Sequence, residues 1–394
     1  MKVLVTTFGI YKKGGWGRIF SEAKGLAALG HQVTLLCSLH GFGIYKSFTE
    51  DGVRIVAFYD IIPSNFLGSG YGLFSLVNKL FYSLFHSYDI CLANHHRDNA
   101  FYPCALNRFI HKSKLVTEWW DNIKIKQEKE GLKSKRWLLR FLAKRDIVQE
   151  TERRKNVDAI IALSSLTAQR AIELGIAEKS IRIVRGGCDI EHIYYYPLSS
   201  EKIKRQYGLS KDYLTFGLIG DGDWEVDDMG IFLDAILDLA SQYKIKLLNY
   251  GKPFKKTIAR NPALKNIIKE CGWIDYTGDN SVLSATDVFI LIKKDTIENR
   301  SGWPNKMGDY LACGRPIMLN PYGELIPFIR EWNPGIIEVN YSKDSIKEKV
   351  TSICEGNYDL VQLGIKNHEI ACSNSWLHRA EELESLFNEL LQKQ

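Results

Sequence analysis

Short apolar runs alternate with amphipathic stretches along the whole chain, in two successive sets. Each run has the length of a buried strand, and the stretches between the runs have helical spacing. This alternation is typical of doubly wound parallel sheets with helices on both faces, so an α/β fold is expected. The predicted strands are Val3–Thr7, Gln32–Cys37, Arg54–Phe58, Ile90–Asn94, Lys114–Glu118, Ala159–Leu163, Ile181–Arg185, Leu214–Ile219, Ile245–Tyr250, Ile268–Gly272, Val288–Ile292 and Ile317–Leu319.

The length of 394 residues exceeds one typical core and predicts two domains. A linker is expected over Asp189–Ser200, where an Ile-Tyr-Tyr-Tyr-Pro run leaves the last strand of the first half. We therefore predict an N-terminal domain over residues 1–190 and a C-terminal domain over residues 200–373. Residues 374–394 are expected to form a C-terminal amphipathic helix.

Composition narrows the class of protein. The chain is 45% hydrophobic and 25% charged, which is ordinary for a globular protein, and its formal net charge of +6 permits contact with anionic surfaces. Its 8 cysteines are scattered without Cys-x-x-Cys pairs, so reduced thiols and no metal site are predicted. The first strand starts at once and no apolar run reaches about 18 residues, so neither a signal peptide nor a membrane span is expected. These features predict a cytoplasmic protein.

The most informative stretch runs from Gly302 to Pro316 and reads Gly-Trp-Pro-Asn-Lys-Met-Gly-Asp-Tyr-Leu-Ala-Cys-Gly-Arg-Pro. A turn opens a short helix that Gly314 and Pro316 end. Lys306 lies in the first turn, where a cation opposes the helix dipole unless an anion binds there. Asp309 is three residues further on the same face. A cation for phosphate beside a carboxylate for sugar hydroxyls predicts a nucleotide-sugar site, although an ordinary surface helix has the same pattern.

This stretch resembles the nucleotide-sugar-binding motif of family 4 glycosyltransferases, in the variant Trp-Pro-x-Lys-x-x-Asp/Glu-Tyr-Leu-Ala-x-Gly-x-Pro. The family usually has two acids eight positions apart here. The resemblance assigns contact with the ribose to Asp309, whereas Ser301 stands where the first acid is expected and Glu298 is offset by three. It also implies donor contacts from the whole loop, namely Gly302, Trp303, Pro304, Asn305 and Lys306.

The layout of the chain resembles the GT-B fold, in which two Rossmann-like domains face each other across a cleft. Ala-Leu-Gly-His-Gln-Val-Thr at the second strand and Ile-Arg-Ile-Val-Arg-Gly-Gly-Cys-Asp before the linker stand where the family has counterparts. The closing Ser375-Trp376 followed by a helix is also similar, and the resemblance implies that this helix packs back on the N-terminal domain.

A glycine-rich loop follows the first strand and reads Gly14-Gly15-Trp16-Gly17-Arg18. Gly15 and Gly17 let the backbone approach a bound group, and Arg18 offers a cation to a phosphate or a role in catalysis. A dinucleotide-binding dehydrogenase would instead need Gly-x-Gly-x-x-Gly with an acid ending the second strand. Neither the third glycine nor the acid is present.

Two further groups of residues follow strands of the first half. His95 and His96 lie in the loop after one strand, where open α/β sheets bind ligands, and the resemblance places one of them beside the donor sugar. Adjacent histidines are expected to point apart, and solvated loop histidines remain an alternative. After another strand, Trp119, Trp120 and Asp121 are candidates for the acceptor side, with core packing of a tryptophan equally expected.

In the second half, Gly220 opens a stretch with acids at positions 221, 223, 225, 227 and 228. The family has a basic residue there. An acidic loop would repel a diphosphate unless a metal intervened, so phosphate binding is assigned to Lys306, the loop backbone and Arg18. The resemblance places the nucleobase near Trp273 and Ile274.

A basic amphipathic segment covers residues 133–145, where Trp137, Leu138, Phe141 and Leu142 stand among lysines and arginines. Such a helix suits peripheral contact with an anionic membrane. Packing of the same face into the core is the alternative.

The resemblance therefore implies a retaining glycosyltransferase that moves a sugar from a nucleotide-diphosphate sugar to the hydroxyl of a glycan or lipid-linked acceptor. Catalytic roles are expected for Lys306, His95, His96 and Arg18. The donor is a substrate, and neither a separate cofactor nor nucleic acid is expected. A nucleotide-sugar epimerase of the same fold and a non-catalytic sugar-nucleotide-binding subunit remain alternatives.

Overall fold

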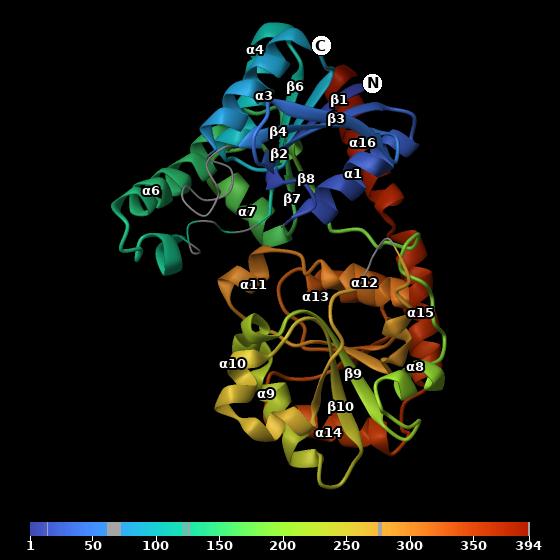
Figure 1. Ribbon diagram of the computed structural model, residues 1–394. Coiled ribbons are helices and arrows are strands. Elements are labelled where there is room, and N and C mark those ends of the chain that lie inside the picture. The colour runs from blue at the N-terminus through green and yellow to red at the C-terminus, as the bar shows by residue number, and fades with distance from the viewer. Residues whose placement is uncertain are drawn as a thin grey trace. The chain divides into compact units, whose positions relative to one another are not determined.

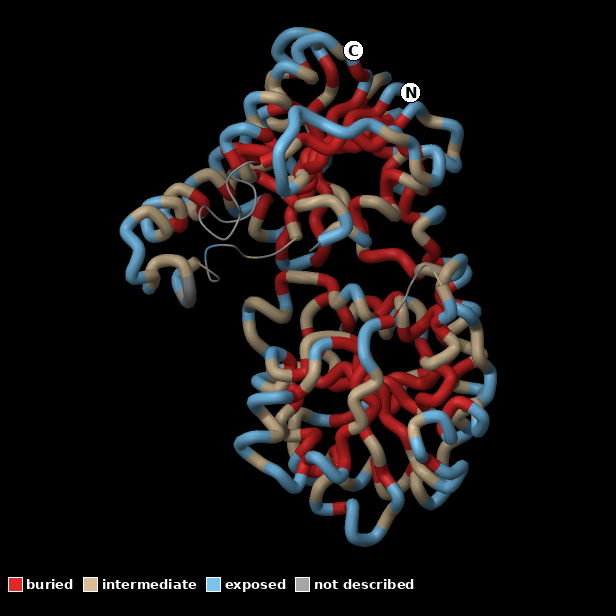
Figure 2. The backbone as a smooth tube through the Cα atoms, in the orientation of Figure 1, coloured by how far each residue is buried: buried red, intermediate tan, exposed pale blue. Residues whose placement is uncertain are grey.

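The computed structural model describes residues 1–13, 15–60, 72–120, 122, 124, 127–274 and 278–392. The chain divides into two compact units, each with its own buried core (Figure 2). Unit 1 comprises Met1–Gly187, Arg300–Trp303 and Trp376–Gln394, and unit 2 comprises Cys188–Asn299 and Pro304–Ser375. None of the described helices is long and apolar enough to cross a membrane.

Unit 1 is built on an 8-stranded sheet in the order β3-β4-β2-β1-β5-β6-β7-β8. The ladders are parallel except between β3 and β4. The predicted strands form, and β3 is added at the edge, where its exposed side chains gave no apolar run. The bounds are β1 Lys2–Ile10, β2 Gln32–His40, β3 Tyr45–Glu50, β4 Val53–Asp60, β5 Ile90–Ala93, β6 Lys114–Trp119, β7 Ala159–Ala162 and β8 Ile181–Ile183.

Helices cover both faces of this sheet (Figure 1). On one face α1 and α16 pack together, and Gly25 of α1 lies so close to Ala380 that an added Cβ would clash at 2.7 Å. On the other face α4 packs Phe101 and Cys104 against the strands, with α3 beside it. The bounds are α1 Trp16–Ala28, α3 Leu73–Phe85, α4 Asp98–His111, α6 Trp137–Glu152, α7 Ser165–Glu173 and α16 Trp376–Gln392.

Unit 2 has a 6-stranded parallel sheet in the order β11-β10-β9-β12-β13-β14. Strand β14 was not predicted because only its first two residues, Ile336 and Ile337, are apolar. The strands are β9 Leu214–Asp221, β10 Ile245–Lys252, β11 Ile268–Glu270, β12 Val288–Leu291, β13 Ile317–Leu319 and β14 Ile336–Glu338. The helices are α8 Glu201–Gln206, α9 Gly222–Leu239, α10 Lys255–Arg260, α12 Lys306–Cys313, α13 Leu325–Trp332, α14 Lys343–Cys354 and α15 Leu360–Ser373. Helix α11, Ile297–Ser301, begins in unit 2, and its last two residues belong to unit 1.

Tight contact between β9 and β10 depends on glycine. Gly251 has φ 158°, and a Cβ on it would lie 1.9 Å from the carbonyl oxygen of Gly220. Only glycine fits there without displacing the backbone. The two strands therefore end close together, at the edge where parallel sheets bind ligands.

Candidate functional site

The helix α12 is anchored to the sheet of unit 2 by one side. The hydroxyl of Tyr310 accepts a hydrogen bond from the backbone N–H of Ile219 at 3.2 Å, and the Tyr310 ring stacks on Phe289 with 4.2 Å between centroids. With that side fixed, Lys306 and Asp309 lie half-buried in the first turn of the helix. The predicted phosphate cation and ribose acid therefore belong to one rigid element.

The ammonium of Lys306 lies at the end of β9. Its Nζ donates to Glu225 Oε1 at 2.8 Å, and a Cβ added to Gly220 would be 3.3 Å from the same Nζ. Burial lowers the pKa of Lys306, and the negative charge of Glu225 partly offsets that effect. The lysine is thus brought next to the glycine that the sequence singled out, and it is held there by a carboxylate.

A second cation that sequence reasoning missed completes this cluster. Lys293 Nζ lies 3.4 Å from Glu225 Oε2 and 3.1 Å from Asp228 Oδ2. Burial would lower the pKa of Lys293, but Glu225 and Asp228 together raise it, so the lysine stays charged. Its place two residues beyond β12 was the available signal, because ligands bind beyond the carboxyl ends of parallel strands.

The prediction of an acidic loop over residues 221–228 was wrong, because α9 begins at Gly222. Its acids have structural partners, which accounts for their number. Asp223 accepts from the backbone N–H groups of Lys256 and Thr257 at 3.0 Å each. Asp221 pairs with Lys252 at 2.9 Å.

Backbone donors contribute less at α12 than the sequence suggested. The N–H of Met307 already donates to Pro304 at 2.9 Å, and that of Gly308 donates to Asn305 at 3.1 Å. These bonds tighten the first turn and occupy two of the four groups that a helix start leaves open. Attraction of an anion at this point therefore depends more on the Lys306 side chain.

The other predicted donor residues have different surroundings. Trp303 and Ile274 are buried, and Gly302, Pro304 and Asn305 are half-buried or exposed. Ser301 has no carboxylate to replace the expected acid. Its backbone carbonyl accepts hydrogen bonds from Ser164 Oγ at 2.6 Å and Thr167 Oγ1 at 2.7 Å. Trp273 is 69% exposed, which leaves its ring accessible for stacking.

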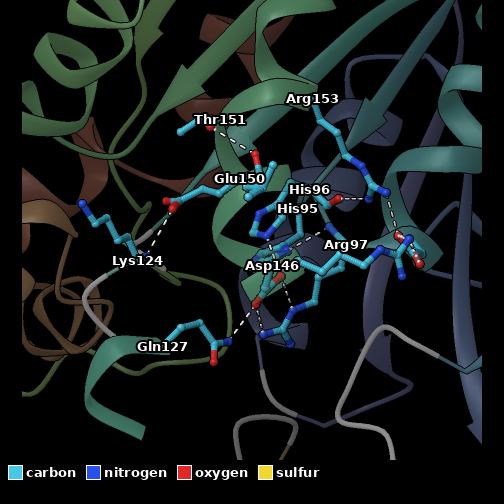
Figure 3. Close-up of polar contacts among 12 residues, drawn as sticks. His95, His96, Arg97, Lys124, Gln127, Asp146, Glu150, Thr151 and Arg153 are labelled. Carbon is cyan, nitrogen blue, oxygen red and sulfur yellow. Dashed lines mark hydrogen bonds and ion pairs between the residues drawn. The ribbon is translucent and has the colours of Figure 1, made fainter. Parts of the chain in front are cut away.

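In unit 1 the two histidines form a buried polar cluster around Asp146 of α6 (Figure 3). His96 Nε2 donates to Asp146 Oδ1 at 2.7 Å, and Arg97 and Gln127 donate to Oδ2 at 2.9 Å and 2.8 Å. The expectation that the histidines point apart was wrong. They lie in the loop after β5, as predicted, but their rings stack with 4.2 Å between centroids.

Both histidines are neutral at pH 7. Burial, with the nearby charges of Arg97 and Arg154, lowers the pKa of His95 well below its usual value. Burial lowers the pKa of His96 to about 4, although Asp146 opposes this. Since the N–H of Arg97 donates to His95 Nδ1 at 3.2 Å, His95 carries its proton on Nε2. Neutral His95 can therefore donate one hydrogen bond, for example to a hydroxyl.

The buried neutral histidines predict a loss of stability in acid. Unfolded His96 takes up a proton below pH 6.5, whereas the folded side chain resists until about pH 4. Stability should therefore be complete above pH 6.5 and fall through this window, on the order of 3 kcal/mol from His96 alone. Thermal unfolding from pH 7 to pH 4.5 measures it. His96→Gln, which keeps a donor for Asp146 but does not titrate, should flatten the curve, and an unchanged curve would assign the loss to other groups.

Two predicted site residues of unit 1 are structural. Arg18 is 4% exposed, and its guanidinium contacts Glu22 at 2.8 Å and Glu118 at 3.1 Å, which leaves it unsuited to meet a phosphate. Trp119 is 1% exposed, and its Nε1 donates to Glu150 at 2.9 Å. The structure thus supports the core alternative for Trp119 and removes Arg18 from the candidate site.

The glycine-rich loop and Trp120 meet in the same unit. Gly15 has φ 69°, and a Cβ on it would lie 3.0 Å from the Trp120 ring, whereas open space surrounds the Cα of Gly17. Trp120 is half-buried and lies 6.4 Å from Phe8, which in turn contacts His95. These residues form one surface of unit 1, and Asp121 lies outside the described residues.

Sequence reasoning missed the two acids at the centre of the buried polar cluster around the histidines. Asp146 and Glu150 are four residues apart directly after the basic segment, so they share one face of α6. There Asp146 pairs with Arg97 and Glu150 pairs with Arg170, while Arg154 donates to the carbonyl of Glu150. Two acids at helical spacing next to a basic stretch were the available signal. Within the described ranges, no group of three or more His, Cys, Asp or Glu side chains is placed to hold a metal ion.

Comparison with known proteins gives a family match in the N-terminal half of the chain. Residues 14–192 match the family model of Glycosyltransferase Family 4. An uncharacterised glycosyltransferase of Methanocaldococcus jannaschii is 22% identical over 205 residues, which are 52% of this chain and 51% of that protein. The chain thus spans about half the length of the curated relative it matches.

Solved structures resemble the whole chain. HepE of Anabaena, in complex with UDP and glucose, has a TM-score of 0.72 at 14% identity, over 98% of this chain and 99% of HepE. Sucrose-phosphate synthase of Thermosynechococcus elongatus has a TM-score of 0.72 at 13% identity, over 100% of both chains. The predicted resemblance is confirmed at the level of the fold: the chain has the GT-B fold, and its residues 14–192 match the Glycosyltransferase Family 4 model.

Proposed function

We propose that the protein is a retaining glycosyltransferase that transfers a sugar from a nucleotide-diphosphate sugar to an acceptor hydroxyl. The observation that carries the proposal is the cation cluster at the carboxyl ends of β9 and β12. Lys306 and Lys293 are held there by Glu225, within a unit whose α12 also carries Asp309. Retention follows from the family resemblance.

The chemistry needs stabilisation of a leaving diphosphate. Negative charge grows on that group as the glycosidic bond breaks, and an oriented cation in a partly dry site lowers the barrier. Lys306 supplies this charge, and Glu225 keeps the ammonium oriented before the donor binds. Lys293 supplies a second charge near the first. Once a diphosphate binds, both lysines can share their hydrogen bonds between it and the carboxylates.

A uridine nucleotide is the first donor to test. The related HepE structures contain UDP, and one contains UDP-glucose. In this chain the exposed ring of Trp273 suits stacking on a base, and Gly272 before it has φ 80°, which turns the backbone sharply. The proposal gives Trp273 the base and Asp309 the ribose.

The acceptor is proposed to meet unit 1. His95 offers a neutral N–H donor, and Trp120 offers a half-buried aromatic surface near it. A glycan or lipid-linked acceptor fits this combination of one polar donor and an apolar ring. On the same unit, Trp137 and Phe141 of α6 are 71% and 58% exposed, so they do not belong to the core. We propose that this basic helix contacts an anionic membrane, at its inner face.

Asp309→Asn is expected to weaken donor binding while keeping the fold. The substitution removes charge-assisted hydrogen bonds to the ribose, each stronger than a neutral one, and we expect about a tenfold rise in the donor Kd. Calorimetric titration with the donor measures it. Asp212→Asn is the control, because Asp212 is an exposed acid whose partner is Lys244 at 3.4 Å and no donor role is proposed for it. Equal donor affinity in Asp309→Asn and the unchanged chain would remove Asp309 from the site.

The function itself is tested by following donors without and with acceptors. UDP-, GDP- and dTDP-sugars are incubated with the protein, and nucleoside diphosphate and sugar are identified by mass spectrometry and NMR. Slow release of nucleoside diphosphate alone, accelerated by an acceptor that gains the sugar, is the expected result. An epimerised sugar would support an epimerase instead. Donor binding with no release under any condition would indicate a non-catalytic subunit.

A further inference from the structure

Helix α3 of unit 1 is oriented with its polar side inward. Its buried residues are Ser75, Lys79 and Ser83. Lys79 Nζ donates to the carbonyl of Thr7 at 2.9 Å, and Ser75 Oγ donates to Asp60 Oδ2 at 3.1 Å. Burial lowers the pKa of Lys79 to about 8. Polar contacts therefore contribute much of the attachment of α3 to the domain, together with Tyr82, which packs against Phe58.

The outward side of α3 is apolar. Its exposed large side chains are Leu73, Phe74, Val77, Phe81, Leu84 and Phe85. Helix α4 packs beside α3 through a hydrogen bond from Asn107 Nδ2 to the Ser83 carbonyl at 2.9 Å, and it also exposes apolar side chains (Figure 1). There Phe109 is 76% exposed and Ile110 is 37% exposed. We call these eight side chains the α3–α4 apolar face.

Such a surface is costly in water. Burial of one large apolar side chain is worth about 1.5–3 kcal/mol, and contiguous exposed apolar patches of this kind mark interaction sites. In a surface helix the apolar side normally faces the core, so the arrangement of α3 is the reverse of the usual one. A partner that covers the α3–α4 apolar face is therefore expected.

The charges at its edge indicate which partner. Neither α3 nor α4 exposes an acid, because Asp98, the one acid in the two helices, is buried and paired with Arg145 at 2.8 Å and Arg153 at 2.7 Å. Beside Phe109 lies a hollow of about 530 Å³ whose charged lining residues are Arg108, Lys112, Lys114 and Asp158. Asp158 is paired with Arg108 at 3.2 Å, which leaves the two lysines as the excess charge. This excess of cations beside the apolar surface complements an anionic bilayer.

We propose that the α3–α4 apolar face is a second membrane-contact surface, which inserts shallowly into an anionic lipid bilayer. At 13 residues, α3 is about 20 Å long and too short to cross a hydrocarbon core of about 30 Å, so it lies in the plane of the interface. A second copy of the chain fits less well, because a two-fold contact brings the same patch, with its edge cations, against itself.

This inference rests on the proposed function in one respect, namely that the protein contacts an anionic membrane. The position of the second contact surface is derived separately, from the exposed side chains of α3 and α4. The face is separate in sequence from α6, where Trp137 and Phe141 are exposed. Variants of each surface therefore separate the two claims. Neither surface includes a residue proposed for donor binding, so donor turnover tests the enzymatic proposal independently.

The experiment is sedimentation of the full chain with vesicles of phosphatidylcholine alone or with 30% phosphatidylglycerol, roughly the charge density at which basic patches bind. Phe81→Glu with Phe85→Glu should lower the partition coefficient on anionic vesicles by at least about tenfold, since two aromatic anchors are lost. Phe81→Ser with Phe85→Ser, which adds no charge, should lower it in the same direction. Trp137→Glu with Phe141→Glu is the parallel variant for α6.

Each result decides the matter. Loss of vesicle binding in both α3 variants, at unchanged melting temperature and unchanged donor hydrolysis, supports the proposal. Wild-type binding that the α3 variants retain would overturn it, whatever the α6 variant does. So would a wild-type chain that fails to bind anionic vesicles. A dimer in light scattering that the α3 variants convert to a monomer would assign the face to a second copy.

Discussion

Lys306→Ala is expected to lower kcat by about 100-fold or more, the scale of removing one oriented charge stabiliser. Lys306 Nζ sits at the end of β9 beside Gly220, and two neighbouring backbone N–H groups of α12 are already bonded within the turn. The side chain therefore contributes most of the positive charge that α12 offers. Because charge on the leaving group grows in the transition state, kcat should fall more than donor affinity. Steady-state kinetics with the identified donor measures both.

Two variants define this prediction. Lys306→Arg should restore activity only in part, since the planar guanidinium is bulkier and points differently from an ammonium. Lys343→Ala, which removes an exposed lysine paired with Asp238 at 2.9 Å, should leave kcat unchanged. Weaker donor binding with an unaltered kcat in Lys306→Ala would show that Lys306 anchors only the ground state. Lys293 would then be the next candidate, because Arg18 is buried between two glutamates.

Asp146→Ala is expected to destabilise unit 1 by about 3 kcal/mol or more, because it leaves buried His96 and half-buried Arg97 without their acceptor. Asp146 accepts from His96, Arg97 and Gln127 at once, and its side chain is 1% exposed. These contacts lower the pKa of Asp146 against the effect of burial. Urea unfolding followed by circular dichroism measures the loss.

The control for Asp146 is an exposed acid in an ion pair. Asp212→Ala removes a partner of Lys244 at 3.4 Å, and should change stability by about 0.5 kcal/mol or less. Asp146→Asn should lie between the two, since the amide oxygen still accepts one hydrogen bond but carries no charge. If Asp146→Ala were as stable as Asp212→Ala, the cluster around Asp146 would be solvated, and Asp146 would not fix the positions of the histidines.

Most strands could be predicted because buried parallel strands read as continuous apolar runs. Strand Tyr45–Glu50 was not predicted because an edge strand exposes its side chains. Strand Ile336–Glu338 was not predicted because only two of its residues are apolar. Residues 222–228 were taken for a loop because their acids hide the helical pattern. Those acids pair with residues from other elements, such as Lys293 and the start of α10, and such pairs cannot be seen locally.

In the candidate site, too, residues of one local motif could be predicted, whereas residues that depend on contacts between separate elements could not. Lys306 and Asp309 belong to one continuous motif, so their residue types and spacing were enough to propose them. Arg18 also follows a glycine-rich loop, but its partners Glu22 and Glu118 are fixed by packing, which turns it into the core. Lys293 and Asp146 are the reverse case, because each becomes important only where separate elements meet.

The central claim is that unit 2 binds a nucleotide-diphosphate sugar through the cluster around Lys306. Thermal unfolding of the wild-type chain and of Lys306→Ala against UDP-, GDP- and dTDP-sugars tests it most directly. A donor at 100 times its Kd should stabilise the folded protein by about 2.7 kcal/mol. We predict that at least one donor raises the melting temperature of the wild-type chain, and that the rise is smaller in the variant at equal concentration. No rise with any donor at millimolar concentration, or an equal rise in both proteins, would contradict it.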